Sequence, residues 1–583
     1  MKTFFYFFKI KLFILCIYKW IKEDMMKKKL SFLLFLCLMV CSFCITKHYV
    51  KSEKIVFENF GLNKDCSLEE GLKAAKEAEK IEILIKVNSK KFEKESLSDN
   101  DVTHEQVRSF KKDRLEKGKK HFYNNNKVIF DKLGLSNYVD FYISKYSPFI
   151  ELSFDAKYFN EKSLEILSII SKALDIEVAY VKEVANINKD TNFVTNFSNA
   201  GAYSIYNNSN APYTGVDVNV GLLESGVVDE DHVNMFYSNL NVRDELLFFE
   251  TETDHATMMA TVICGQLGAA RGCNLFSVQL SGNPTGEMEW LLDHDIDLVN
   301  MSFTEQNPTG NYDSTSAYFD FIAYTYNVVF VAGAGNEGEG TGNIGNPGMG
   351  YNVLTVGSTG SDGSPTIFSS TMDNRGAPKP TICTYGYAIV PNFTGQQAGT
   401  SFSCAFVTSF IAILMEQYPL LKDNPALIMT LVCATAKTLP SFTSTTPSGL
   451  NDYVGAGNFR YDNILEFFGN YYATIINVDN IDSIVYSRQI YANVGDEVKG
   501  ALGWTAVSDG TINGIEYCNF DLRLRGPNGY VYAMSNGNTS IVEMVKLLEA
   551  PVAGMYTFEV VQRSNIVQDY EIIYICYCTN PSE

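Results

Sequence analysis

Residues 298–332 read LVNMSFTEQNPTGNYDSTSAYFDFIAYTYNVVFVA. This stretch opens with a short apolar run at residues 298–301 and closes with a second at residues 328–332, and a helical stretch at residues 314–326 separates them. Apolar strands that alternate with helices are typical of a parallel sheet covered on both faces. We therefore expect a strand, a helix and a strand here, with both strands buried in the centre of an α/β fold.

The same alternation extends in both directions, from about residue 212 to residue 475. Further strands are predicted at residues 216–223 and 353–356, and further helices at residues 288–294 and 402–418. We expect residues 195–475 to form one α/β domain.

A domain boundary is expected near residue 190, because the density of charge changes there. Residues 46–194 hold 26 Lys and Arg and 25 Asp and Glu in 149 positions, whereas residues 195–583 hold 13 and 40 in 389. Apolar periodicity in the first of these regions predicts strands at residues 80–87, 149–154 and 175–181 and a helix at residues 161–174. We expect residues 46–194 to form a small α+β domain that follows a charged, lysine-rich helical insertion.

The pattern changes again after about residue 476, where helical periodicity disappears. Short alternating segments are separated by Gly, Asn and Pro turns, and they lie at residues 521–524, 530–534, 555–561 and 570–577. This spacing is typical of an all-β sandwich or jelly roll. We expect one over residues 476–583.

The first 45 residues resemble an export segment. The apolar run at residues 30–45 follows Lys27, Lys28 and Lys29, which is the order of a secretory signal peptide. The sequence therefore predicts a secreted or cell-surface protein. A retained anchor is the alternative, and it is the only reading that brings membrane contact; if Met26 is the true start, residues 1–25 are an upstream extension.

Composition and charge exclude several classes. Hydrophobic residues make up 46% of the chain and charged residues 20%, which excludes global disorder and a polytopic membrane protein. The formal net charge is −20, and by count it is +7 over residues 1–194 and −27 over residues 195–583. Nucleic acid is therefore excluded as a partner of the larger part, since phosphate binding needs clustered Lys and Arg.

Two segments carry candidates for nucleophilic chemistry. Ser401 follows Gly399-Thr400 at the start of a strongly apolar helix, where backbone N–H groups can stabilise an oxyanion. His255 opens another apolar helix and is the natural general base among six histidines. The alternatives are a helix cap for Ser401 and a structural histidine for His255.

Two further segments place polar side chains at the ends of strands. Asn336 lies between glycines after the strand at residues 328–332, where its amide can point into a cleft. Glu224 ends the strand at residues 216–223, and a carboxylate leaving a buried strand needs a donor such as imidazole. A turn asparagine and a surface glutamate are the alternatives.

In their order along the chain, these four residues resemble those of the subtilisin-like serine proteases, or subtilases. An acid, a histidine, an asparagine and a serine occur at positions 224, 255, 336 and 401, and acid-histidine-serine is the subtilisin order. Residues 297–302 also resemble the substrate-binding strand of the family, and residues 353–370 resemble the segment after its oxyanion asparagine. The resemblance implies that Ser401 is the nucleophile, His255 the base, Glu224 the third triad member and Asn336 the oxyanion donor. It implies substrate contacts for Ser302, Phe303, Thr304, Gly333 and Ala334, with Phe303, Gly333 and Ala334 bordering an apolar pocket.

The resemblance also implies where the protein acts, what it cleaves and how it is made. We expect a secreted serine endopeptidase that cleaves protein or peptide substrates, needs no cofactor, and is made as a self-processed precursor whose propeptide, residues 46–194, inhibits it. Calcium is common in the family, and the loop at residues 229–231 with Asn234 offers oxygen ligands, although a solvated acidic surface is the alternative.

The chain departs from the family pattern in two important places. Glu224 stands where subtilases have Asp, and Thr304 stands where they have a glycine that contacts the substrate backbone. These departures motivate one alternative function, a catalytically impaired peptide-binding protein. Another is a surface adhesin that acts through residues 476–583.

Overall fold

The computed structural model describes residues 54–58, 67–75, 80–90, 92, 102–135, 140–183, 213–236, 238–243, 250–265, 268–280, 282, 284–305, 308–338, 342–371, 377–439 and 448–580. The predicted export segment lies outside the described residues, and so does the predicted domain boundary near residue 190.

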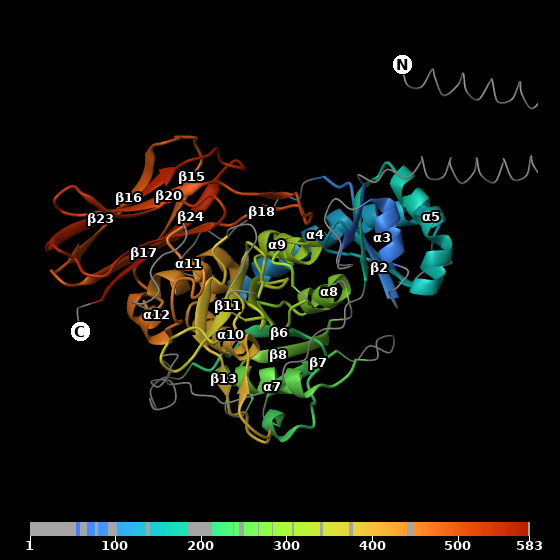
Figure 1. The fold of residues 1–583 in the computed structure, drawn as a ribbon, viewed down its shortest axis with the longest axis horizontal. Helices are drawn as coiled ribbons and strands as arrows, with labels where there is room; N and C mark the ends of the chain where they lie inside the picture. The colour runs from blue at the N-terminus through green and yellow to red at the C-terminus, as the bar shows by residue number, and fades with distance from the viewer. Residues whose placement is uncertain are drawn as a thin grey trace, which may run out of the picture.

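A seven-stranded parallel sheet forms the centre of the molecule, in the order β12-β11-β10-β9-β6-β8-β7 (Figure 1). Its strands are β6 (Asn219–Glu224), β7 (Asn239–Val242), β8 (Asn274–Gln279), β9 (Leu298–Met301), β10 (Val329–Gly333), β11 (Val353–Thr359) and β12 (Ile382–Tyr385). The predicted parallel sheet is confirmed.

Helices cover both faces of this sheet. Along β10, Val331 joins the core that contains α7 (Asp254–Ile263), α10 (Thr400–Gln417) and α11 (Pro425–Thr435). Its neighbour Phe330 joins a second core with α8 (Thr285–Asp293) and α9 (Ser314–Tyr326). Because successive side chains of a strand point to opposite faces, both faces are buried and the strand reads as one apolar run.

The N-terminal unit, residues 54–183, contains a mixed five-stranded sheet in the order β1-β5-β2-β4-β3. Its elements are β1 (Ile55–Glu58), α3 (Leu68–Ala75), β2 (Lys80–Val87), α4 (His104–Leu133), β3 (Asp140–Ile143), β4 (Phe149–Asp155), α5 (Ala156–Lys172) and β5 (Ile176–Glu183). Helices α3 and α5 pack on one face of the sheet.

The sequence analysis expected the charged helical insertion to precede this unit. The structure places it within the unit, between β2 and β3. Helix α4 follows β1 and β2 in the chain. The expectation was wrong because the sheet forms by long-range pairing: β2, which precedes α4 in the chain, pairs with β4 and β5, which follow it.

Two four-stranded antiparallel sheets follow at the C-terminus. One contains β15 (Tyr471–Ile476), β24 (Glu571–Asn580), β17 (Glu497–Gly503) and β22 (Val542–Leu547), and the other contains β16 (Ile484–Ala492), β23 (Gly554–Gln562), β20 (Phe520–Arg525) and β21 (Val531–Ser535). Leu522 and Phe558 of one sheet and Ile575 of the other share a core, as the predicted sandwich requires. Helix α11 packs on β17 and β24 and joins this region to the central sheet.

Helix α10 is unusually apolar. Among the described residues it alone has the length and hydropathy of a membrane span, but 89% of it is buried inside the fold. Its composition therefore reflects its place in the core.

Candidate active site

Glu224 and His255 meet at the carboxyl end of β6. The Glu224 side chain is fully buried, and its Oε2 lies 3.1 Å from Nδ1 of His255. His255 is the second residue of α7, a helix that begins where the Thr253 hydroxyl accepts a hydrogen bond from the Ala256 N–H. The cap sets the start of the helix and thereby holds the imidazole against the strand end.

The second oxygen of Glu224 has a partner of its own. The backbone N–H of Ser302 donates to Oε1 at 3.2 Å. Because both carboxylate oxygens have partners, the cost of burying this group is offset and its orientation is defined. Glu224 thus connects the residue after β9 to the helix that carries His255.

Ser401 and Ser302 are joined by two reciprocal hydrogen bonds. The Ser401 hydroxyl donates to the Ser302 carbonyl at 3.1 Å, and the Ser302 hydroxyl donates to the Ser401 carbonyl at 2.9 Å. Ser401 is the second residue of α10, which packs against α7, β9 and β10. These contacts link Ser401, Ser302, Glu224 and His255 at the carboxyl ends of β6 and β9, two neighbouring strands inside the central sheet.

Asn336 is anchored beside the start of α10. Its Oδ1 accepts from the Thr400 backbone N–H at 2.9 Å and from the Thr400 hydroxyl at 3.2 Å. With Oδ1 occupied, the donor end of the amide, Nδ2, points elsewhere. A Cβ built on Gly399 would lie 3.6 Å from Asn336 Nδ2 and 3.8 Å from both Asn336 Oδ1 and Ser401 N, so the amide and the Ser401 N–H both lie near Gly399.

Gly335 makes this arrangement possible. Its φ of +107° is a conformation that side chains rarely adopt, and its N–H donates to the Thr400 hydroxyl at 3.1 Å. The turn therefore places the Asn336 amide beside the start of α10, and the hydrogen bond from Gly335 to Thr400 holds the turn there. Thr400 was not singled out in the sequence, because its partners lie 64 and 65 positions away along the chain.

The predicted substrate-contacting residues have different surroundings. Phe303 and Ala334 are buried in hydrophobic clusters beneath the surface. Thr304 is partly exposed, and its Cβ lies 2.6 Å from the position a Cβ would take on Gly345. Gly333 packs against Thr400, whose Oγ1 would be 3.2 Å from an added Cβ. The apolar pocket implied by the resemblance stays a prediction.

Cys404 lies one helical turn after Ser401 but has the chemistry of a core residue. Its thiol is fully buried and contacts Asn300 Oδ1 and the Val331 carbonyl, each at 3.2 Å. Burial raises the pKa of Cys404 to about 12. At neutral pH the group is a thiol, which is a weak nucleophile, so Ser401 has no thiolate competitor on this turn.

The loop suggested for calcium uses its oxygens internally. Asp229 Oδ1 accepts from the Asp231 N–H at 3.0 Å, and Asn234 Oδ1 accepts from Asn392 at 2.6 Å. Within the described part of the chain, no three His, Cys, Asp or Glu side chains are placed to hold a metal ion. Calcium at this loop stays a prediction from the resemblance.

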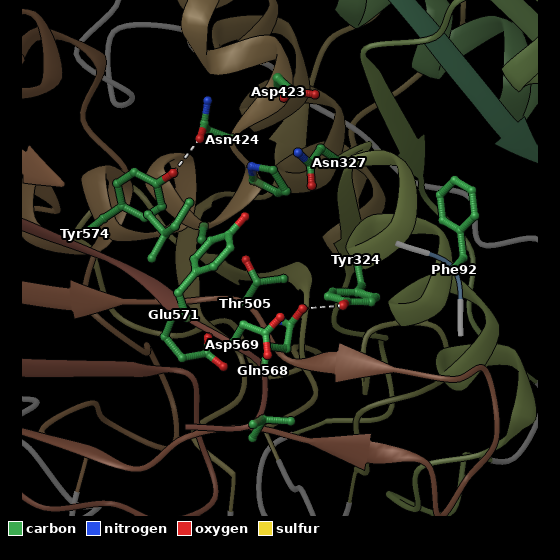
Figure 2. A pocket seen from close by; sticks show the side chains of 15 residues that line it. Phe92, Tyr324, Asn327, Asp423, Asn424, Thr505, Gln568, Asp569, Glu571 and Tyr574 are labelled. Carbon is green, nitrogen blue, oxygen red and sulfur yellow. Dashed lines mark hydrogen bonds between the residues drawn. The ribbon is translucent and has the colours of Figure 1, made fainter. Parts of the chain in front are cut away.

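A cavity of about 600 Å³ lies elsewhere, where α9 and α11 meet the C-terminal strands. Figure 2 shows two hydrogen bonds among the residues that line it. The Tyr324 hydroxyl donates to Gln568 at 2.7 Å, and the Tyr574 hydroxyl donates to Asn424 at 2.5 Å. No predicted site residue lines this cavity, so it is separate from the candidate active site.

Parts of the chain are similar to known proteins. Residues 181–457 match the model of the subtilase family of peptidases. Mycosin-1 from Mycolicibacterium smegmatis (strain ATCC 700084 / mc(2)155) is 38% identical over 114 residues, which are 18% of this chain and 23% of mycosin-1. The match thus spans about a quarter of that relative.

Two solved structures are also similar. The prenylagaramide maturation protease PagA is 21% identical with a TM-score of 0.37, and the match covers 46% of this chain and 98% of that protein. The patellamide maturation protease PatA is 22% identical with a TM-score of 0.35, covering 43% and 96%. On the match to the family model, residues 181–457 of this chain belong to the subtilase family.

Proposed function

We propose that the chain is a secreted serine endopeptidase that hydrolyses peptide bonds through an acyl-enzyme. The observation that carries this proposal is the position of Glu224, which contacts His255 Nδ1 with one oxygen and the Ser302 N–H with the other. An imidazole held by a carboxylate, beside a serine at a helix N-terminus, is the arrangement that activates a hydroxyl for attack on a carbonyl.

In this proposal Ser401 Oγ attacks the carbonyl carbon of a bound peptide while His255 takes the hydroxyl proton. Glu224 holds the tautomer with Nδ1 protonated and stabilises the imidazolium. The imidazolium then gives its proton to the leaving amine as the C–N bond breaks. Water attacks the resulting ester with His255 again as base, which releases the acid and restores Ser401.

The developing oxyanion needs donors on the side of Gly399. Asn336 Nδ2 and the Ser401 N–H both border that space, so we assign them this role. The Ser401 hydroxyl donates to the Ser302 carbonyl and must turn toward His255 before attack. Such rearrangements are usual, since catalytic hydrogen bonds often tighten only when substrate is bound.

A fluorophosphonate probe tests the nucleophile directly. We expect labelling of the wild-type protein and its loss in Ser401→Ala and His255→Ala. Ser403→Ala is the matched control, because Ser403 lies on the same helix but donates to the Thr384 carbonyl. Absence of labelling in folded protein freed of its N-terminal unit would favour the peptide-binding alternative instead.

We further propose that the N-terminal unit is an inhibitory propeptide. Two of its carboxylates contact the first residues of helices: Glu58 accepts from the Ser314 N–H at 3.2 Å and from its hydroxyl at 2.6 Å, and Glu151 accepts from the Thr285 N–H at 3.1 Å. The first backbone N–H groups of a helix have no partner within the helix, and these carboxyl oxygens supply one. The sheet is thereby attached over α8 and α9.

Self-processing gives a simple readout of this second proposal. Wild-type protein should accumulate as two pieces cut near residues 185–200, while Ser401→Ala stays intact. Export is tested by the N-terminal sequence of the recovered protein, which should begin after the export segment of residues 1–45.

A further inference from the structure

The proposed nucleophile and oxyanion donors define where a substrate carbonyl would lie. Ser401 Oγ lies 3.1 Å from the Ser302 carbonyl, and the Asn336 amide lies after the neighbouring strand β10. The substrate residue that carries the carbonyl is therefore flanked by residues 302–304 on one side and residues 334–336 on the other. Its side chain enters the space between these two segments, so the size of this space decides which residue can precede the scissile bond.

Two apolar side chains of these segments are packed in the fold. Phe303 is 7% exposed and belongs to the core that contains α8 and α9. Ala334 is fully buried in a cluster with Ile344 and Met349. The side chain that extends from the first segment towards the second is Thr304, which is partly exposed.

The Thr304 side chain fills the gap between two glycines. Its Cγ2 lies 3.6 Å from the position that a Cβ would take on Gly335, the residue before Asn336. For a Cβ on Gly345, the distances are 2.6 Å to Thr304 Cβ and 3.1 Å to Cγ2. The first of these is closer than two side-chain carbons can approach. A substrate side chain that extends this far therefore meets Thr304.

Hydrogen bonds hold the Gly345 side of this gap in place. The Gly345 N–H donates to the Ala334 carbonyl at 3.3 Å, and the Glu305 N–H donates to the Asn346 carbonyl at 3.1 Å. The Asn346 side chain is buried; its Nδ2 donates to Glu305 Oε1 at 2.9 Å and its Oδ1 accepts from Ser316 at 2.5 Å. Widening the gap would break several of these buried bonds, which is unfavourable.

The Gly335 side is held in the same way. The Ser370 N–H donates to the Gly335 carbonyl at 2.9 Å, and the Ser370 hydroxyl accepts from the Glu337 N–H at 3.1 Å. The Gly335 N–H is bonded to Thr400. Both sides are thus fixed, and the space cannot expand easily around a larger side chain.

Glu305, the residue after Thr304, does not favour a basic side chain in this space. One of its oxygens accepts from Asn346. Burial, together with the charge of Asp313, raises the pKa of Glu305 to about 8. The group is therefore mostly protonated at neutral pH and offers no full negative charge to lysine or arginine.

We propose that Thr304 restricts the residue before the scissile bond to one with a small side chain, namely glycine, alanine or serine. The substrates are then protein segments cut after such residues. The inference rests on the proposed peptidase function and names its substrate class. One methylene too many in a fitted pocket costs about 10–200-fold in kcat/KM, and a benzyl group exceeds a methyl group by far more than one methylene.

The test compares two peptidyl diphenyl phosphonates on the full chain, which differ only in carrying the methyl group of alanine or the benzyl group of phenylalanine at the reacting position. Ser401 Oγ attacks phosphorus and displaces phenol, and mass spectrometry measures the rate at which the ester forms. We expect the methyl probe to react at least about 100-fold faster. In Thr304→Gly the benzyl probe should react at least about 10-fold faster than in the wild type.

Two further variants serve as controls. Thr304→Val preserves the shape of the side chain and should keep the wild-type ratio of the two rates. Thr309→Gly makes the same change as Thr304→Gly at an exposed position nearby and should also leave the ratio unchanged. A benzyl probe that reacts as fast as the methyl probe in the wild type would overturn the proposal, and so would a wild-type ratio in Thr304→Gly.

A fluorophosphonate, which carries no amino-acid side chain, reports separately on the proposed enzyme. If it does not label Ser401, the size limit is measured by binding instead, with peptides that end in alanine or phenylalanine and Ser401→Ala protein. Tighter binding of the alanine peptide, reversed in Thr304→Gly, supports the proposal. Equal affinities, or no binding of either peptide, overturn it.

Discussion

Glu224 is one methylene longer than the aspartate of the subtilase pattern, and the structure shows how the extra length is used. The carboxylate spans from His255 Nδ1 to the Ser302 N–H and contacts both. An aspartate on the same backbone would reach about 1.5 Å less far, so it could keep only one contact without movement of β6. The length of Glu224 is therefore matched to this site.

Substitutions at Glu224 test this view. We expect Glu224→Ala to lower kcat by about 10⁴-fold, and Glu224→Asp to lower it by about 10²-fold, as a misplacement of roughly 1 Å does. Asp254→Ala is the control, because this exposed neighbour of His255 should contribute nothing. Steady-state kinetics on a peptide substrate measure all three, and wild-type turnover in Glu224→Ala would remove Glu224 from the triad.

Asn336 gives a second prediction at the scale of one side chain. If its amide donates only to the oxyanion, Asn336→Leu should lower kcat by about 10²–10³-fold with little change in KM. A rise in KM with kcat unchanged would instead place the amide in ground-state binding.

The turn after β10 and the start of α10 together position Asn336, one of the proposed oxyanion donors. Thr400 joins the turn to the helix, since its hydroxyl accepts from the Gly335 N–H and donates to Asn336 Oδ1. Thr400 touches no reacting atom in the proposed mechanism, so it is a positioning residue.

Replacing this hydroxyl should misplace the amide while leaving the nucleophile in position. We expect Thr400→Val to lower kcat about 10-fold and the free energy of unfolding by about 1–3 kcal/mol, because the buried Gly335 N–H loses its acceptor. Thr400→Ser keeps the hydroxyl and should recover most of both. If valine reduces stability but leaves kcat at the wild-type value, Thr400 has a structural role only.

Sequence patterns predicted some elements to the residue and missed others for physical reasons. The bounds of β9 and α9 agree with the sequence, because a strand buried on both faces and a helix between two such strands leave long apolar runs.

Strand β7, at the edge of the sheet, has alternately exposed positions and two asparagines, and it was not predicted. The contact of Glu224 with His255 followed from the family resemblance. The burial of Lys111 and Arg114 could not be predicted, since α4 carries charges on every side and only tertiary packing selects which are covered.

At the scale of the whole molecule, the interface between the N-terminal unit and α8 is acidic. Glu151 of β4 faces Glu287, and burial together with the Glu287 charge holds the pKa of Glu151 well above its usual range. Burial also raises the pKa of Glu289, which accepts from Tyr142 and Ser144. The assembled protein therefore binds protons that the separated parts release.

Association of the cut chain should accordingly depend on pH. The contribution of Glu151 is fully present below the ordinary glutamate pKa of about 4.3 and is lost as pH rises through the raised pKa. The dissociation constant should thus be larger at pH 8 than at pH 5, and Glu151→Gln should flatten this dependence. Burial raises the pKa of Asp297, but the charges of Lys111 and Lys422 lower it further, so its net shift is downward. Protonation of Asp297 therefore affects the dissociation constant only below about pH 4. A steeper pH dependence in Glu151→Gln would contradict the assignment.

Helix α10 places Ser401, the proposed nucleophile, on a segment of the hydrophobic core. The helix has 18 residues with almost no charge, and 89% of it is buried inside the fold. In a partly folded chain this apolar segment is exposed, which favours aggregation. The proposed nucleophile therefore reaches its final surroundings in the same folding step that shields this segment from water.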